Sequence, residues 1–158
     1  MIQLSAHFSL EEAVLSQEAA RKGIDNSHPD PRIITNASKT AVHLESVRKL
    51  LGDNSIHINS WIRCIELNRA LGSKDSSQHI NGEAVDFICP MFGTPTQIAK
   101  LISLNLVLCD FDQLILEHTW VHISWSALPN AQQRNQVLSL LQDGSYARGL
   151  TDKQGNHL

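Results

Sequence analysis

Cysteine is scarce in this sequence, and the cysteines present form no recognisable pair. The chain has three, Cys64, Cys89 and Cys109, and no two of them are spaced Cys-x-x-Cys. Most of the residues beside them are apolar, so we expect small side chains buried in the core. Two alternatives stay open, a cysteine ligand to zinc and a thiol nucleophile.

The sequence also lacks a long apolar run and an excess of positive charge. No apolar stretch approaches the roughly 20 residues that cross a bilayer, which predicts no membrane insertion. The formal net charge is -3 at pH 7, so no basic field attracts nucleic acid or an anionic membrane surface. Residues 1–7 have neither the basic start nor the apolar stretch of a signal peptide. We therefore expect a protein that is cytoplasmic as made.

Repeats, low-complexity tracts and linkers rich in proline, glycine or serine are absent as well. The chain has 158 residues, of which 42% are hydrophobic and 18% charged. These are the proportions of a globular protein rather than of a disordered one. We expect one domain over residues 1–158, long enough to bury a core without disulfides.

The first part of the chain is predicted to be helical. A serine followed three residues later by a glutamate is a capping box, and it predicts a helix over residues 9–22 that ends at Gly23. Two prolines within residues 26–31 predict a loop. Apolar residues at helical spacing predict a second helix over residues 37–51.

The second part alternates short helices with strands. Strands are expected over residues 56–60, 83–89, 111–117 and 120–125, and helices over residues 64–71 and 94–104. Residues 136–149 predict a hairpin around Asp143-Gly144, although residues 135–142 fit a helix equally well. Because helices come first and strands cluster later, the predicted class is α+β with a mainly antiparallel sheet and N-terminal helices.

The stretch Ser76–Asp86 carries the chemistry of the chain. It places His79 and Asp86 seven positions apart, with a glycine turn between them. An imidazole nitrogen and a carboxylate oxygen are ordinary zinc ligands, and His122, within Trp120–Ser124, is the best candidate for a third. Catalytic zinc sites keep three protein ligands and leave the fourth position to water or substrate. The pattern therefore predicts a zinc hydrolase.

The two strands around His118 and Thr119 give a test of this site. If those two residues form the turn, Glu117 lies opposite Trp120, and Ile115 lies opposite His122. Side chains alternate between the faces of a strand, so Glu117 and His122 then share a face. They are diagonal neighbours, whose carbon atoms lie roughly 7–8 Å apart or somewhat less. At that separation a carboxylate can hold a water molecule on the metal and move its proton.

Four motifs, in one order, resemble the zinc D-Ala-D-Ala carboxypeptidase family of peptidoglycan metallopeptidases, whose fold is shared with the Hedgehog signalling domain. The motifs are Leu4-Ser5-x-His7-Phe8-Ser9-Leu10-x-Glu12; Asn59-Ser60-Trp61-Ile62-Arg63 followed by Leu67-Asn68; Ser77-x-His79-x-x-Gly82-x-Ala84-x-Asp86; and Phe111-Asp112-Gln113-Leu114-Ile115-x-Glu117 before Trp120-Val121-His122-Ile123-Ser124. The last of these is similar to members encoded by phages and prophages. Each motif alone is weak, but the four together cover most of the chain.

The resemblance implies one zinc ion per chain, held by His79, Asp86 and His122. It also implies that Glu117 is the general base and that Arg63 steadies the substrate carbonyl or carboxylate. Ser77 and Gln78, just before the first ligand, are expected to line the substrate cleft.

The substrate that the resemblance implies is a peptidoglycan peptide. The resemblance implies that the protein cuts this peptide as a D,D-carboxypeptidase or as an endopeptidase, with an endolysin-like activity. The protein would then reach the cell wall through lysis machinery or as part of a virion.

The chain departs from the family pattern at two places. The arginine turn commonly reads Ser-Gly-Tyr-Arg, whereas here Trp61 and Ile62 precede Arg63. Some relatives carry an acid or a second histidine where Thr119 and Trp120 stand here. The base is therefore Glu117 or is absent.

Absence of a base would make the chain a non-catalytic zinc module that binds cell-wall peptide or a protein partner. A third hypothesis is a cysteine hydrolase that uses Cys64 or Cys89.

Beside the site, Glu83 is expected to be an exposed charge and His118 to point to solvent. The tryptophans could pack the core or floor the cleft.

Overall fold

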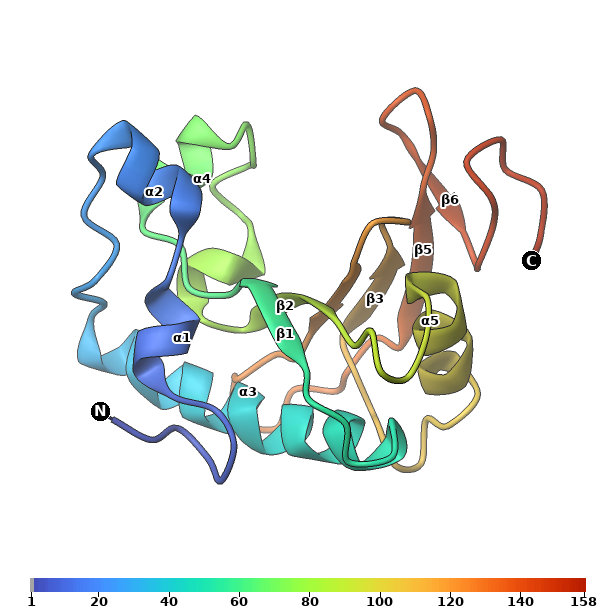
Figure 1. The fold of residues 1–158 in the computed structure, drawn as a ribbon, viewed down its shortest axis with the longest axis horizontal. Helices are drawn as coiled ribbons and strands as arrows, with labels where there is room; N and C mark the ends of the chain where they lie inside the picture. The colour runs from blue at the N-terminus through green and yellow to red at the C-terminus, as the bar shows by residue number, and fades with distance from the viewer. Residues whose placement is uncertain (1) are drawn as a thin grey trace.

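Helices dominate the first half of the fold and a sheet the second, in agreement with the predicted α+β class (Figure 1). The computed structural model describes residues 2–158. The helices are α1 (Leu10–Val14), α2 (Gln17–Lys22), α3 (Pro31–Leu50), α4 (Ile65–Ala70), the 3-10 helix η1 (Gln78–Asn81) and α5 (Pro95–Ser103). The strands are β1 (His57–Ser60), β2 (Ala84–Ile88), β3 (Gln113–Leu116), β4 (Val121–Ser124), β5 (Gln136–Leu140) and β6 (Tyr146–Arg148).

The strands form one six-stranded sheet in the order β1-β2-β4-β3-β5-β6. Every neighbouring pair is antiparallel except β3 and β5, which are parallel. The sheet is therefore mixed but mostly antiparallel, as predicted. The neighbouring strands β2 and β4, both inside the sheet, carry Asp86 and His122 as a directly paired couple.

The connection between β3 and β4 has the predicted register. Ile115 pairs with His122, and the Glu117 N–H donates to the Trp120 carbonyl at 3.1 Å. His118 takes the left-handed conformation, with a φ of 63°, which lets two residues reverse the chain. Glu117 consequently projects from the same face of the sheet as His122.

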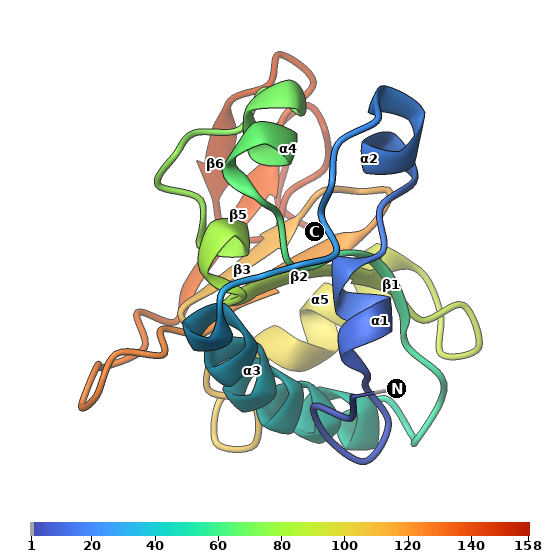
Figure 2. The same ribbon diagram turned by 90° about the vertical axis from the view of Figure 1, so that its left-hand side faces the viewer.

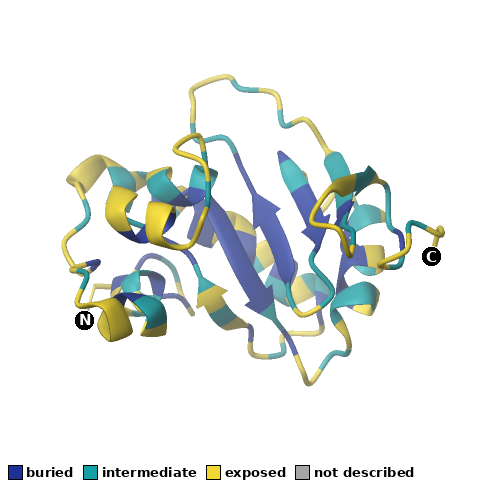
Figure 3. Cartoon of the chain, turned by 90° about the horizontal axis from the view of Figure 1, so that it is seen from above, coloured by how far each residue is buried: buried dark blue, intermediate teal, exposed yellow. Residues whose placement is uncertain are grey.

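The two faces of the sheet have different roles. On one face, Val85, Phe87, Leu114 and Leu116 join the buried residues of α3 and α5 in a hydrophobic core. The predicted apolar face of the long helix lies in this core, and Figure 2 shows α3 and α5 along that side of the sheet. Figure 3 looks onto the opposite face, which lies between the short helices at one end and the β5–β6 hairpin at the other.

The first helix is not continuous to Lys22, so that prediction is wrong. α1 ends at Val14, and α2 begins at Gln17. The Ser16 hydroxyl accepts a hydrogen bond from the Ala19 N–H at 3.1 Å, so it starts a new helix. A second capping serine in the middle of the segment was the signal for this break.

The long helix begins earlier than residue 37. The Asp30 side chain caps it by accepting from the Arg32 N–H at 2.8 Å, and Pro31 occupies the first turn. A proline fits the first turn because the N–H it lacks would have no partner there. This helix of 20 residues is the longest of those named above, and no helix within residues 2–158 is long and apolar enough to cross a membrane.

The β5–β6 hairpin at the end of the chain and Glu83 in its middle differ in how they match the predictions. The hairpin of β5 and β6 around Asp143-Gly144 is confirmed, and the helical alternative is wrong. Glu83 is not an exposed charge, because it is 8% exposed and its carboxylate accepts from the Ala127 N–H at 2.7 Å. It fixes the segment after β4 to the start of β2.

Gly82 marks the place where the turn before β2 contacts α3. Its φ is 73°, and a Cβ there would lie 2.9 Å from the Ile33 carbonyl oxygen and 3.2 Å from the Ile33 Cγ2. The Gly82 carbonyl accepts from the Thr40 hydroxyl and from the Trp61 indole, each at 3.0 Å. Only glycine fits both the conformation and the space.

Gly82→Ala is expected to lower the free energy of unfolding by roughly 2–4 kcal/mol. The cost of holding alanine in the left-handed conformation adds to the cost of the close contact between its Cβ and the backbone of α3. Gly144→Ala is the matched control, since its φ is 84° but no atom lies within 4 Å of the added Cβ. Urea unfolding of both variants separates the two effects. Equal losses would show that the contact with α3 contributes nothing.

Candidate metal centre

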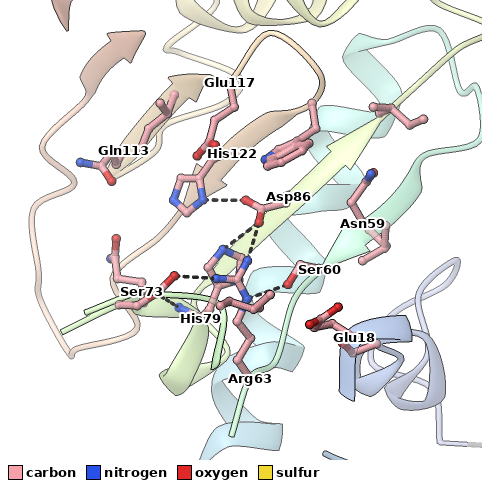
Figure 4. Close-up of a pocket in the computed structure, with 18 of the residues that line it drawn as sticks. Glu18, Asn59, Ser60, Arg63, Ser73, His79, Asp86, Gln113, Glu117 and His122 are labelled. Carbon is pink, nitrogen blue, oxygen red and sulfur yellow. Dashed lines mark hydrogen bonds and ion pairs between the residues drawn. The ribbon is translucent and has the colours of Figure 1, made fainter. Parts of the chain in front are cut away.

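His79, Asp86 and His122 reach the site from three different elements. Ser77 caps η1 and so starts the turn that carries His79. β2 and β4 hold Asp86 and His122 in register. All three residues are buried, and one potential ligand atom from each lies within 4.8 Å of the others. The predicted ligands therefore lie together (Figure 4).

The contacts among the three side chains converge on the Asp86 carboxylate. Asp86 Oδ1 lies 2.8 Å from His122 Nδ1, and Asp86 Oδ2 lies 3.2 Å from His79 Nε2. The two imidazole rings meet edge to face, with centroids 5.1 Å apart. Two nitrogen donors and one carboxylate are a donor set that zinc accepts, with an open position left over.

The state of His79 tests whether a cation fits. His79 Nδ1 lies 2.7 Å from the Trp61 carbonyl oxygen, which can only accept, so Nδ1 carries the proton. Burial lowers the pKa of His79, so the ring is neutral and Nε2 has a lone pair. That lone pair faces a carboxylate oxygen 3.2 Å away. Two acceptors at this distance repel unless a cation lies between them, and zinc meets that need.

Asp86 is ionised in this setting. Burial raises its pKa, but the hydrogen bond with the His122 ring acts in the opposite direction, and the pKa lies below its ordinary value. The Arg63 guanidinium adds a second donor, because Nη2 donates to Asp86 Oδ2 at 2.7 Å. A charge buried this deeply needs such partners.

Arg63 is largely occupied by neighbours within the site. Besides Asp86, its Nε donates to the Ser60 hydroxyl at 2.8 Å, and Nη1 lies 3.4 Å from the Ser73 hydroxyl. These bonds use three of the five guanidinium N–H groups. The arginine thus orients a metal ligand, and Arg63 also lines the cavity.

Glu117 follows the last residue of β3 and lines the same cavity as the three ligands (Figure 4). Its carboxylate has no hydrogen-bond partner within residues 2–158. Burial and, after it, the charge of Asp86 raise the pKa of Glu117 above the ordinary value. A carboxylate with raised proton affinity beside a metal site is suited to acid–base chemistry.

The cavity above the sheet has a volume of about 960 Å³. Ser77 and Gln78 line it, but both side chains also have structural partners. The Ser77 hydroxyl caps η1, and Gln78 Nε2 donates to Asp112 Oδ2 at 3.0 Å. Trp120 lines the cavity, whereas Trp61 and Trp125 are buried in the core. The predictions had left the place of the tryptophans open.

Asn26 supports the site from outside the cavity lining, and sequence reasoning missed it. Its amide donates to the Val14 and Ile62 carbonyls, and its oxygen accepts from the Cys64 N–H at 2.7 Å. Asn26 therefore clamps the turn that carries Arg63. The sequence marked it only as part of a loop, and its partners are 12 to 38 positions away.

His118 and the three cysteines lie outside the group of candidate catalytic residues. His118 does not point to solvent, because its Nε2 lies 2.9 Å from the Leu140 carbonyl oxygen. None of the three cysteines lines the cavity. Cys89 and Cys109 are buried, Cys64 Sγ caps α4, and burial raises the pKa of the Cys109 thiol to about 11. These positions do not favour a cysteine nucleophile.

Comparison with known proteins agrees with the metal centre. The family model described as Peptidase M15 matches residues 6–124, about three quarters of the chain. The matched region contains every predicted ligand, together with Arg63 and Glu117. No curated protein matches the chain.

We expect stability to fall in acid partly through Asp112, which is 5% exposed. Hydrogen bonds from Arg134, at 2.9 and 2.6 Å, lower the pKa of Asp112 below 3.8. The ionised form therefore stabilises the fold above this pH, and the stabilisation disappears as pH falls through the lowered pKa. Urea midpoints should show the advantage of the unaltered protein over Asp112→Asn shrinking from pH 5 downward. Asp110→Asn, at an exposed position, is the control; a pH-independent Asp112→Asn difference would contradict the prediction.

Removing a ligand is expected to remove the metal. His79→Ala or Asp86→Ala should weaken zinc affinity by at least about 100-fold, more than the loss of an outer partner costs. His57→Ala, which alters a cavity histidine outside the trio, should leave affinity unchanged. Competition with a chromophoric chelator measures this, and circular dichroism checks folding. Full affinity in His79→Ala would exclude this centre.

Proposed function

The chain belongs to the peptidase M15 family of metallopeptidases, and on this premise we propose that it hydrolyses a peptide bond in peptidoglycan stem peptides or their cross-links. The observation that carries the proposal is the pair of buried acceptors, His79 Nε2 and Asp86 Oδ2, that face each other at 3.2 Å. His79, Asp86 and His122 would hold the zinc ion. When bound, zinc supplies a Lewis acid and lowers the pKa of water toward about 7.

Glu117 is the general base of the proposed reaction. Its raised pKa increases the tendency of the carboxylate to take a proton from the attacking water. The protonated carboxyl can then deliver that proton to the amine that leaves. The absence of a hydrogen-bond partner within residues 2–158 leaves both carboxylate oxygens available for this exchange.

Arg63 has two tasks in this proposal. Its bonds to Asp86 and Ser60 fix the guanidinium in place. The N–H groups that these bonds leave over can donate to the substrate carbonyl as negative charge develops on its oxygen. A donor that is held rigid before the reaction needs no reorganisation during it.

Ser77 and Gln78 would contact the peptide beside the first ligand. Gln78 is held by Asp112, so its remaining amide groups have a defined direction. The cavity of about 960 Å³ is large enough to take several residues of peptide. We further propose a setting in phage or prophage lysis, with release to the wall by lysis machinery or in a virion. This setting is supported by the resemblance of Phe111–Glu117 and Trp120–Ser124 to the phage-type motif.

The decisive experiment is mass spectrometry of defined muropeptides incubated with zinc-loaded protein. We expect cleavage that a chelator stops and added zinc restores, and the product masses name the bond. Glu117→Gln should lower the rate by about 10²–10⁴-fold, as loss of a general base does, while zinc still binds.

Glu66→Gln, an exposed carboxylate outside the cavity lining, is the matched control and should cleave like the unaltered protein. Undiminished cleavage by Glu117→Gln would contradict the assignment of the base. Stoichiometric zinc without cleavage of any muropeptide would replace hydrolysis by peptide binding.

A further inference from the structure

A row of side chains crosses the cavity face of the sheet and reaches beyond Glu117. Trp120 stands opposite Glu117 on one side. On the other side β5 runs parallel to β3, and the last residues in register are Leu116 and Ser139. The residues that follow them, Glu117 and Leu140, therefore lie beside each other. Leu140 in turn pairs with Tyr146 on β6. Directly paired residues share a face of the sheet, so Tyr146 faces the same way as Glu117.

The hairpin that carries Tyr146 is hydrogen-bonded to the connection between β3 and β4. His118, next to Glu117, lies with its Nε2 2.9 Å from the Leu140 carbonyl oxygen. Tyr146 lines the same cavity as Glu117 and His122. Its side chain is not core packing, since Tyr146 is 53% exposed. The hairpin is thus a wall of the cavity, and it lies outside the residues 6–124 that match the family.

The polar groups along this row have unused hydrogen-bonding capacity. The Trp120 indole nitrogen is buried and has no partner within residues 2–158. Neither the Glu117 carboxylate nor the Tyr146 hydroxyl has a hydrogen-bond partner in that part of the chain. Burial, and then the charges of Glu117 and Asp86, raise the pKa of Tyr146, so its hydroxyl remains a donor. The Trp120 indole N–H and the Tyr146 hydroxyl are donors, and such donors suit a ligand that supplies carbonyl oxygens.

We propose that Tyr146 is a substrate-contacting residue whose hydroxyl donates a hydrogen bond to a backbone carbonyl of the bound peptide. This inference rests on the proposed peptidase function. Two strand spacings separate Tyr146 from Glu117, roughly 10 Å, which corresponds to about three residues of extended peptide. Tyr146 therefore binds the substrate within about three residues of the bond that is cut, on the hairpin side of the metal centre.

Kinetics of Tyr146→Phe test the hydroxyl directly. Because the contact is present in the bound substrate as well as in the transition state, its loss is expected to raise KM by about 2–12-fold and to leave kcat within about 2-fold. Ser145→Ala is the matched control: it also removes one hydroxyl from the hairpin, but from an exposed residue bonded to Asp143. KM of Ser145→Ala should not change. Unchanged KM in Tyr146→Phe, in a protein that cleaves, would overturn the proposal.

The single tyrosine of the chain gives a second readout that does not depend on turnover. In zinc-loaded Glu117→Gln labelled with ¹³C-tyrosine, the one ring signal should shift when a disaccharide pentapeptide is added. Binding seen by calorimetry without a shift would also overturn the Tyr146 assignment and leave the peptidase untouched. If the unaltered protein neither cleaves nor binds the muropeptide, the proposed function fails, and this assignment fails with it.

Discussion

The buried charge of Asp86 is the constraint on which the rest of the structure depends. A carboxylate that is 4% exposed must be compensated. His122 Nδ1 and Arg63 Nη2 contact its two oxygens, and the cation that the neutral His79 would help to hold completes the compensation. His79, His122 and Arg63 come from different segments of the chain, so the charge requires that those segments be placed accurately. Trp61, Asn26 and Gly82 hold the elements in turn, by a carbonyl, an amide and a close contact with α3.

One face of the sheet packs into the hydrophobic core, and the other carries the metal centre. Its strands alternate, so Val85, Phe87, Val121 and Ile123 enter the core, while Asp86 and His122 point into the cavity. A slip of one residue in β2 or β4 would exchange these two sets. Because the core excludes such a slip, packing on one face fixes the geometry of the metal centre on the other. The β5–β6 hairpin extends the cavity face of the sheet past residues 6–124, the region that matches the family model.

Much of the fold was predictable because its signals are local. The alternation of apolar and polar residues in 56–60 and the spacing of apolar residues in 37–51 identified a strand and a helix, and the β3–β4 register followed from one short connection. The errors in the helix boundaries were also local in origin. Ser16 and Asp30 each start a helix through a cap, and a cap competes with the apolar pattern that suggested other boundaries. Glu83 and His118 were misplaced because their partners, Ala127 and Leu140, lie 44 and 22 positions away.

The sequence by itself determined which residue types were present for metal chemistry and at what spacing, since motif order and strand period are properties of short segments. The tertiary structure alone decided that His79 presents Nε2, that Arg63 is anchored on Asp86, and that Tyr146 shares a cavity with Glu117. These facts depend on which strands become neighbours and on which carbonyl a side chain meets. Such contacts join segments far apart in the chain, and only packing of the whole sheet selects them.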